Sequence, residues 1–110
     1  MNLINEKHTD ITNELIRLAN VLDSHYNLEL NFRNHCYLRI AYDNVVQDKW
    51  DKKVNKPFIK NAKESQLIQA IDLLNKYFTD KETLLADNEK SLAYRRKEKK
   101  LKKINTNSLF

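Results

Sequence analysis

The sequence predicts an all-α protein, a small bundle of three main helices with a short extended segment and a long C-terminal helix. Three observations favour this class. Apolar residues recur at steps of three and four along much of the chain, the period of an amphipathic helix. Glycine is absent, and the one proline marks a single strong break. The length of 110 residues suits one domain.

The missing glycines also exclude whole classes of function. A Gly-rich phosphate loop, a dinucleotide-binding fingerprint and a nucleophile elbow all need glycine at fixed positions. Helix ends and turns are expected to use asparagine instead, which tolerates the left-handed conformation. A charged share of 32% and a hydrophobic share of 41% fit a folded chain rather than a disordered one.

The first helix is predicted from about Ile4 to Ser24, with its firm part starting at Thr9 or Asp10, either of which suits an N-cap. One apolar stripe defines it: Ile4, Ile11, Leu15, Leu18 and Leu22. Three neighbours are expected to widen that stripe: Ile16, Ala19 and Val21.

Residues 26–32 alternate apolar and polar side chains, which is typical of an extended segment. We expect a connection laid over the core. The alternative is an α+β fold with a small hairpin over residues 27–42, because Cys36, Leu38 and Ile40 also alternate. Later apolar residues follow at helical steps, so a helix from His35 to Lys49, capped by Asn34, is favoured.

Residues 51–60 form the main break. Pro57 disfavours helical geometry at the preceding residue and suits the start of a short turn, in which Phe58 and Ile59 cover the core. Asn61 and Glu64 then resemble a capping box for a long helix.

The face of this last helix is expected to carry ten apolar residues: Leu67, Ala70, Ile71, Leu73, Leu74, Tyr77, Phe78, Leu84, Leu85 and Leu92. If continuous to Lys103, it would be about 60 Å long, against a radius of gyration near 13 Å for a compact chain of this size. It therefore either breaks near residues 79–81 or projects beyond the domain.

The net charge of +5 is concentrated at the C-terminus. Residues 1–94 carry thirteen bases and fourteen acids and are expected to form the single helical domain. Residues 95–110 form a basic tail with seven bases and one acid, and its candidate nucleic-acid contacts are Arg95, Arg96, Lys97, Lys99, Lys100, Lys102 and Lys103. A solubilising, frayed helix end is the alternative interpretation.

A second candidate site lies in the central segment, where His35, Arg39 and Asp43 recur every four residues and would form one polar row on a helix. Such a row, with further donors and a ring for stacking, suits a phosphate-bearing nucleotide. Its full set is His35, Arg39, Asp43, Asn44, Lys49 and Trp50. The alternatives are an exposed ion pair between Arg39 and Asp43 and a core role for Trp50.

No catalytic group, metal site or cofactor is expected. The three histidines are scattered without the spacing of a metal motif, and Cys36 has no positioned base. A single cysteine, no apolar run that would span a membrane and no signal-peptide core predict a cytoplasmic protein.

The segment NHCYLRIAYDN, followed by KWD and KPF, resembles small, mostly uncharacterised proteins of bacteriophages and bacterial mobile elements, over roughly residues 32–96. Some of those proteins carry an acetyltransferase label. The common GNAT acetyltransferases bind the pyrophosphate with a Gly-containing loop, so that activity is not expected of a chain without glycine.

The leading hypothesis is a non-enzymatic, phage-type accessory protein, acting in host takeover or counter-defence, that binds nucleic acid or a nucleotide. The alternative is a helical interaction module or inhibitor that meets a host defence protein, or forms a homo-oligomer, through the face from Leu67 to Leu92. No membrane contact is expected.

Overall fold

A computed structural model of the protein describes residues 3–108, with side chains described for residues 8–97. The fold is all-α, as predicted, and no strand occurs within residues 3–108, so the alternative hairpin over residues 27–42 is wrong. The elements are α1 (Leu3–His25), α2 (Asn34–Val46), the 3-10 turn η1 (Trp50–Lys52), α3 (Phe58–Asn61), α4 (Glu64–Thr79) and α5 (Lys81–Ser108). None of the helices within this range has the length and apolar character needed to cross a membrane.

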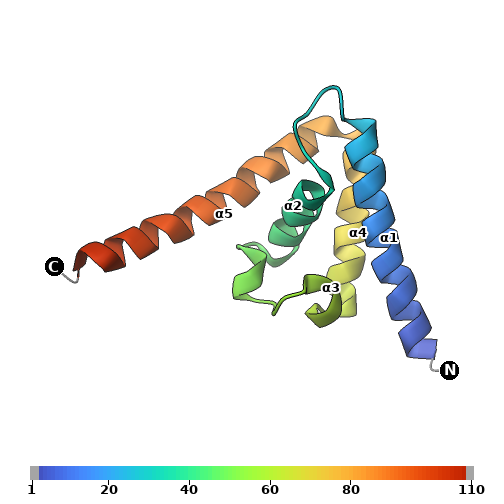
Figure 1. Ribbon diagram of the computed structural model, residues 1–110, viewed down its shortest axis with the longest axis horizontal. Helices are drawn as coiled ribbons and strands as arrows, with labels where there is room; N and C mark the ends of the chain where they lie inside the picture. The colour runs from blue at the N-terminus through green and yellow to red at the C-terminus, as the bar shows by residue number, and fades with distance from the viewer. Residues whose placement is uncertain (1–2, 109–110) are drawn as a thin grey trace.

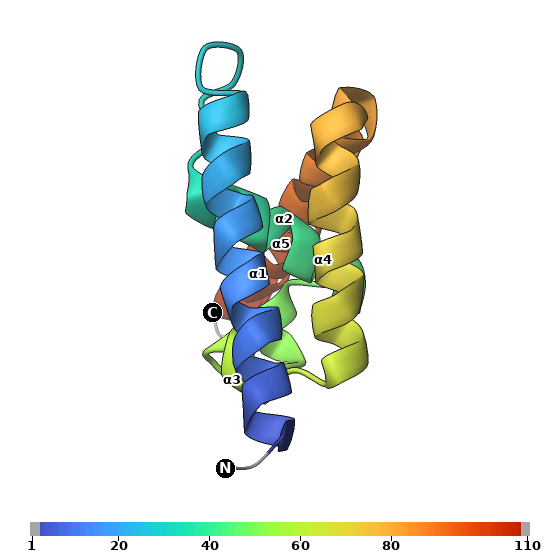
Figure 2. The ribbon, with the colours of Figure 1, turned by 90° about the vertical axis from the view of Figure 1, so that its right-hand side faces the viewer.

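Helices α1 and α4 lie side by side, and α2 packs against α1, α4 and α5 (Figures 1 and 2). The last helix, α5, starts beside the end of α4 and projects away from the other helices (Figure 1). The radius of gyration is 15.7 Å, above the roughly 13 Å of a compact chain of this length, because of this projection.

The core gathers apolar side chains from each of the five α-helices: Leu15, Leu18, Leu22, Tyr37, Ile40, Ala41, Phe58, Leu67, Ala70, Leu74, Tyr77 and Leu84. The predicted stripe of α1 is therefore confirmed at its three leucines. Ile16 and Val21 are 44% and 42% exposed, so the expectation that they widen the stripe is wrong.

The extended connection predicted over residues 26–32 is confirmed at residues 30–32, but it is wrong at residues 26–29, which form a turn. Asn34 is not the N-cap of α2, because Arg33 holds that position and Asn34 is already helical. The Asn34 side-chain amide instead donates a 2.8 Å hydrogen bond to Asn20 Oδ1, which ties α2 to α1.

Helix α2 ends at Val46, three residues before the predicted Lys49. Gln47 follows with φ of 59°, and it is the one described residue with a positive φ, a position where asparagine was expected. The amides of Gln47 and Asp48 both donate to the backbone carbonyl of Asp43, which satisfies the end of the helix without glycine.

The break at Pro57 is confirmed, since Pro57 is the N-cap of α3 and Phe58 is only 2% exposed. The cap of α4 differs from the prediction. Asn61 ends α3, and Lys63 is the N-cap of α4, with its amide donating to Gln66 Oε1 at 2.8 Å.

The long C-terminal helix both breaks and projects. Asp80 separates α4 from α5, and its carboxylate accepts hydrogen bonds from the amide and the hydroxyl of Thr83 at 2.9 and 2.6 Å. The buried residues keep the same heptad spacing across the break, since Leu84 follows Tyr77 by seven residues and is fully buried. Leu85 lies beside this stripe and is 38% exposed, so the expectation that it belongs to the apolar face is wrong. Helix α5 has 28 residues, about 42 Å at 1.5 Å per residue, and it runs through the expected domain boundary between residues 94 and 95.

Candidate nucleic-acid interface and its buried anchor

Asp43 is the centre of the contact between α2 and α5. Its side chain is fully buried, and its carboxylate accepts hydrogen bonds from three groups. Ser91 Oγ donates at 2.6 Å, Arg95 donates from Nε at 2.9 Å and from its terminal nitrogen at 3.2 Å, and the backbone amide of Trp50 donates at 3.0 Å. A buried carboxylate is expected to have such partners, because desolvation without them is costly.

Arg39 lies one turn before Asp43 on α2 and contacts the same side of α5. Its two terminal nitrogens donate to Ser91 Oγ at 2.7 Å and to Asn88 Oδ1 at 2.8 Å. A polar cluster therefore takes the place of apolar packing along this part of the contact between α2 and α5. Its members are Arg39, Asp43, Asn88, Ser91 and Arg95. The cluster fixes how α5 crosses α2.

The polar contacts continue from this cluster toward α4 and α1. Asn44 Nδ2 donates to the backbone carbonyl of Asp87 at 2.9 Å, and Tyr77 Oη donates to the Asp87 carboxylate at 2.7 Å. Tyr26 Oη in turn donates to the backbone carbonyl of Tyr77 at 2.6 Å. Helix α5 is thus held by hydrogen bonds to α2 and to α4.

The predicted polar row is on one face of α2 at Arg39 and Asp43, but the face is turned inward. The expectation that Asp43 is exposed is wrong, and so is the alternative of an exposed ion pair with Arg39, because Asp43 is fully buried and paired with Arg95. His35 is exposed at the first turn of α2.

The other predicted ligand contacts are dispersed. Trp50 is half-buried and packs edge-on against Tyr42 and Phe58, with ring centroids 5.9 and 5.6 Å away, as the core interpretation of Trp50 predicts. Lys49 Nζ lies 3.5 Å from the Asp51 carboxylate. Asn44 borders a shallow hollow of about 320 Å³ between α2 and α4. These six residues therefore do not surround a common pocket.

The predicted basic tail begins with a buried contact. Arg95 is paired with Asp43, whereas Arg96 and Lys97 are exposed on the projecting part of α5. The side chains of Lys99, Lys100, Lys102 and Lys103 lie outside the described residues. The backbone of this part is helical to Ser108.

A second basic segment, residues 49–63, was not expected from the sequence. It carries six lysines and one acid, for a net charge of +5, while residues 1–48 and 64–94 together carry seven bases and thirteen acids. Lys53, Lys60 and Lys63 are exposed. Asp51 is the one acid, and although burial opposes the effect, Lys49 and Lys56 lower the pKa of its carboxyl below the ordinary value.

The buried carboxylate joins both basic segments at their beginnings. Its contact with the amide of Trp50 fixes the start of residues 49–63, and its contact with Arg95 fixes the start of the projecting basic helix. Asn88 and Ser91 complete this anchor and were not predicted. Their signal in the sequence is that Leu84, Asn88, Ser91 and Arg95 follow one another at helical steps of four, three and four.

Within residues 8–97, no three side chains of the metal-binding types come together. Comparison of the chain with protein-family models, with curated proteins and with solved structures finds no match.

Proposed function

We propose that the protein binds the phosphate backbone of double-stranded DNA through two basic surfaces, residues 49–63 and the part of α5 that follows Arg95. One observation carries this proposal, the common attachment of both segments to the carboxylate of Asp43. Lysine and arginine contacts to phosphates supply most of the sequence-independent affinity for DNA. An anchor that fixes two such surfaces relative to one another suits a backbone with regularly spaced charges.

Backbone contact is favoured over contact with unpaired bases. Proteins that bind single strands stack the bases on exposed aromatic rings. Within residues 8–97 every tyrosine, phenylalanine and tryptophan is buried or half-buried. The exposed basic groups described in the two segments are lysines and Arg96, both of which suit phosphate contacts, lysine as a point charge and arginine as a planar donor.

Nucleic acid is also favoured over a free nucleotide. The guanidinium of Arg39 already donates to Ser91 and Asn88, and the carboxylate of Asp43 is saturated and fully buried. Neither group is open to a ligand without breaking the contact between α2 and α5. The exposed lysines of the described residues are instead concentrated in residues 49–63.

The face from Leu67 to Leu92 is the alternative interface with another chain, but its main apolar residues already pack in the core of this protein. Leu67, Leu74 and Leu84 are fully buried within the chain itself. We further propose host takeover or counter-defence as the setting, a proposal that rests on the resemblance noted in the sequence of residues 32–96. DNA binding is the activity we propose for that setting.

The test is the salt dependence of binding to a fluorescent DNA duplex, measured by anisotropy. Ending the chain after Arg96 keeps the contact with Asp43 and removes five bases and one acid. We expect the slope of log affinity against log salt to fall by up to about four. Replacing Lys53, Lys60 and Lys63 by glutamine should lower it by about two to three.

The matched control is the triple variant Lys76→Gln, Lys81→Gln and Lys90→Gln, which removes three lysines outside both segments. It should leave the slope within about one unit of the original. Equal losses in the control and in the segment variant would contradict a defined interface. An unchanged slope after truncation would contradict the role of α5.

A further inference from the structure

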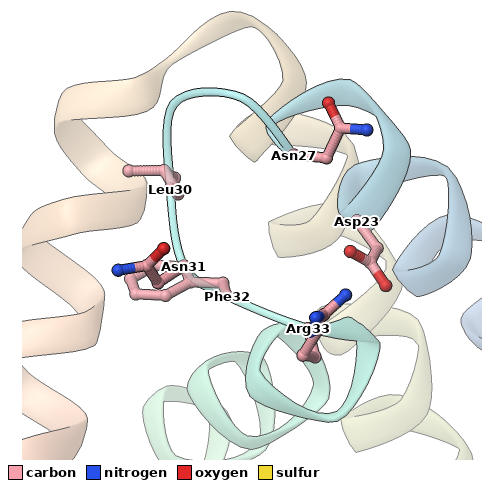
Figure 3. Close-up of a pocket in the computed structure, with 6 residues that line it drawn as sticks. All are labelled: Asp23, Asn27, Leu30, Asn31, Phe32 and Arg33. Atoms are coloured by element: carbon pink, nitrogen blue, oxygen red, sulfur yellow. The ribbon is translucent and has the colours of Figure 1, made fainter.

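A small polar hollow lies between the end of α1 and the start of α2 (Figure 3). The connection between α1 and α2 lies at the other end of the molecule from residues 49–63 and from the projecting part of α5 (Figure 1). The volume of the hollow is about 120 Å³. Six residues line it: Asp23, Asn27, Leu30, Asn31, Phe32 and Arg33. The carboxylate of Asp23 and the guanidinium of Arg33 face one another there, from the last turn of one helix and the N-cap of the next (Figure 3).

The two opposite charges do not pair. Among the described residues, neither the carboxylate of Asp23 nor the guanidinium of Arg33 has an ion pair or a side-chain hydrogen bond. Elsewhere in the molecule, comparable groups do meet, as Arg95 and Asp43 do at 2.9 Å. The separation across the hollow leaves one anionic and one cationic group open to a ligand.

Both charges also stand at the helix end that disfavours them. An acid near a helix C-terminus adds to the negative end of the macrodipole, and a base at an N-terminus adds to the positive end. Asp23 lies in the last turn of α1, Arg33 precedes α2, and the first turn of α2 has no acid to offset it. The wall beside Asp23 therefore attracts a cation, and the wall beside Arg33 attracts an anion. Charges placed against the helix macrodipole in this way are departures from local stability that are expected at functional sites.

A third polar group near the hollow lacks a partner among residues 8–97. Tyr37 is fully buried, and none of these residues forms a hydrogen bond with its hydroxyl. Its ring meets that of Phe32, a lining residue, at 5.7 Å between centroids. Burial raises the pKa of Tyr37 to about 12, and the carboxylate of Asp23 adds to the increase, which places this hydroxyl within the field of the same carboxylate.

We propose that this hollow binds a small zwitterion, with its cationic group on Asp23 and its anionic group on Arg33. The amides of Asn27 and Asn31 offer further donors and acceptors at the rim. An engineered cavity of about 150 Å³ holds benzene, so a hollow of about 120 Å³ encloses a ligand of about five non-hydrogen atoms. Small amino acids have this size and this pair of charges. The site is separate from the proposed DNA surfaces.

The experiment is a titration of the full chain, labelled with nitrogen-15, with glycine, β-alanine and γ-aminobutyrate, followed by amide chemical shifts. The three probes differ in the distance between their charges. We expect saturable shifts confined to residues 23–37 for at least one of them. Ethylamine and acetate, which each carry one of the two charges, should bind about tenfold or more weakly, because each loses a charge-assisted contact.

Asp23→Asn and Arg33→Gln should each weaken binding by about tenfold to a hundredfold. The control variants Asp72→Asn and Arg96→Gln, at exposed positions outside the hollow, should leave the affinity for the zwitterion unchanged. The chain ending after Arg96 should also bind the zwitterion as the full chain does, which separates this result from the DNA test. The absence of saturable shifts with all three probes, or shifts that persist in Asp23→Asn, would overturn the proposal.

Discussion

This fold contains two facing pairs of aspartate and arginine, Asp43 with Arg95 and Asp23 with Arg33. The first pair forms an ion pair and the second does not. The first joins the middle of α2 to α5, with a fully buried carboxylate and a distance of 2.9 Å from Oδ2 to Nε. The second borders a hollow at the loop between α1 and α2, where the two groups face one another without an ion pair (Figure 3).

The difference follows from the surroundings of each pair. Two packed helices exclude water from Asp43, so its charge needs partners within the protein. The loop beside Asp23 and Arg33 leaves both groups in contact with solvent, so neither charge needs a partner within the protein. Residue type alone therefore does not show whether an aspartate and an arginine pair within the protein or stay open to a ligand. The contacts that each group already makes show it.

The largest effect is expected from Asp43→Ala. This change leaves Arg95, Ser91 and the amide of Trp50 without their acceptor inside the contact between α2 and α5. Breaking a buried ion pair by removing one partner costs about 3 to 5 kcal/mol of unfolding free energy. Urea denaturation followed by circular dichroism measures it.

The matched control is Asp72→Ala, on an exposed position of α4, which should change the unfolding free energy by no more than about 0.5 kcal/mol. A loss of under about 1 kcal/mol for Asp43→Ala would contradict the structural role of this carboxylate.

The next effect concerns alkaline pH. Burial raises the pKa of Tyr37 to about 12, and burial also raises the pKa values of Tyr42 and Tyr77 above their ordinary value. Unfolded tyrosines lose their protons near pH 10. Above that pH the unfolded chain binds fewer protons than the folded one, so stability falls as pH rises.

This stability is fully present below about pH 10, and each buried tyrosine removes up to about 1.4 kcal/mol per pH unit above it. Thermal unfolding, with tyrosinate absorbance recorded at the same time, should show unfolding and proton release together. Tyr42→Phe removes one of the three groups and should make the decline shallower. An identical decline in that variant would count against the titration of buried tyrosines.

A third prediction compares a paired and an unpaired hydroxyl. Tyr77→Phe removes the 2.7 Å hydrogen bond to the Asp87 carboxylate, a loss of about 1.5 to 3 kcal/mol for a bond to a charged group. Tyr37→Phe removes a buried hydroxyl without a partner, so its unfolding free energy should stay equal or rise. Both are measured by urea denaturation. Equal losses in the two variants would show that Tyr37 has a partner in solution.

The sequence predicted the helices better than their contacts. Helical periodicity and Pro57 placed the main elements, because apolar spacing and a missing amide act locally. The break near residues 79–81 was one of two predicted outcomes, and Asp80 produces it by capping α5. The exposure of Leu85 was not predicted, because the contacts of α5 with α2 and α4 decide which of Leu84 and Leu85 is buried.

The candidate site was predicted in part. The spacing of Arg39 and Asp43 correctly placed both on one face of a helix, but their partners on α5 are about 50 residues away along the chain. Tertiary packing decides which residues of α5 meet Arg39 and Asp43. The residue spacing within α2 therefore does not predict these partners. The basic segment at residues 49–63 was missed because acids elsewhere cancel its charge in the total for residues 1–94.

The smallest effect tests the unpaired charges by stability alone. Asp23→Asn and Arg33→Gln each remove a charge from the helix end that disfavours it, so each should raise the unfolding free energy by about 0.3 to 1 kcal/mol at low salt. Lys76→Gln is the matched opposite, because Lys76 lies in the last turn of α4, where a base is favourable, and its removal should lower stability by a similar amount. Salt near 1 M shortens the screening length to about 3 Å and should reduce all three effects. A loss of stability in both Asp23→Asn and Arg33→Gln would instead show that these two groups pair in solution as Asp43 and Arg95 do.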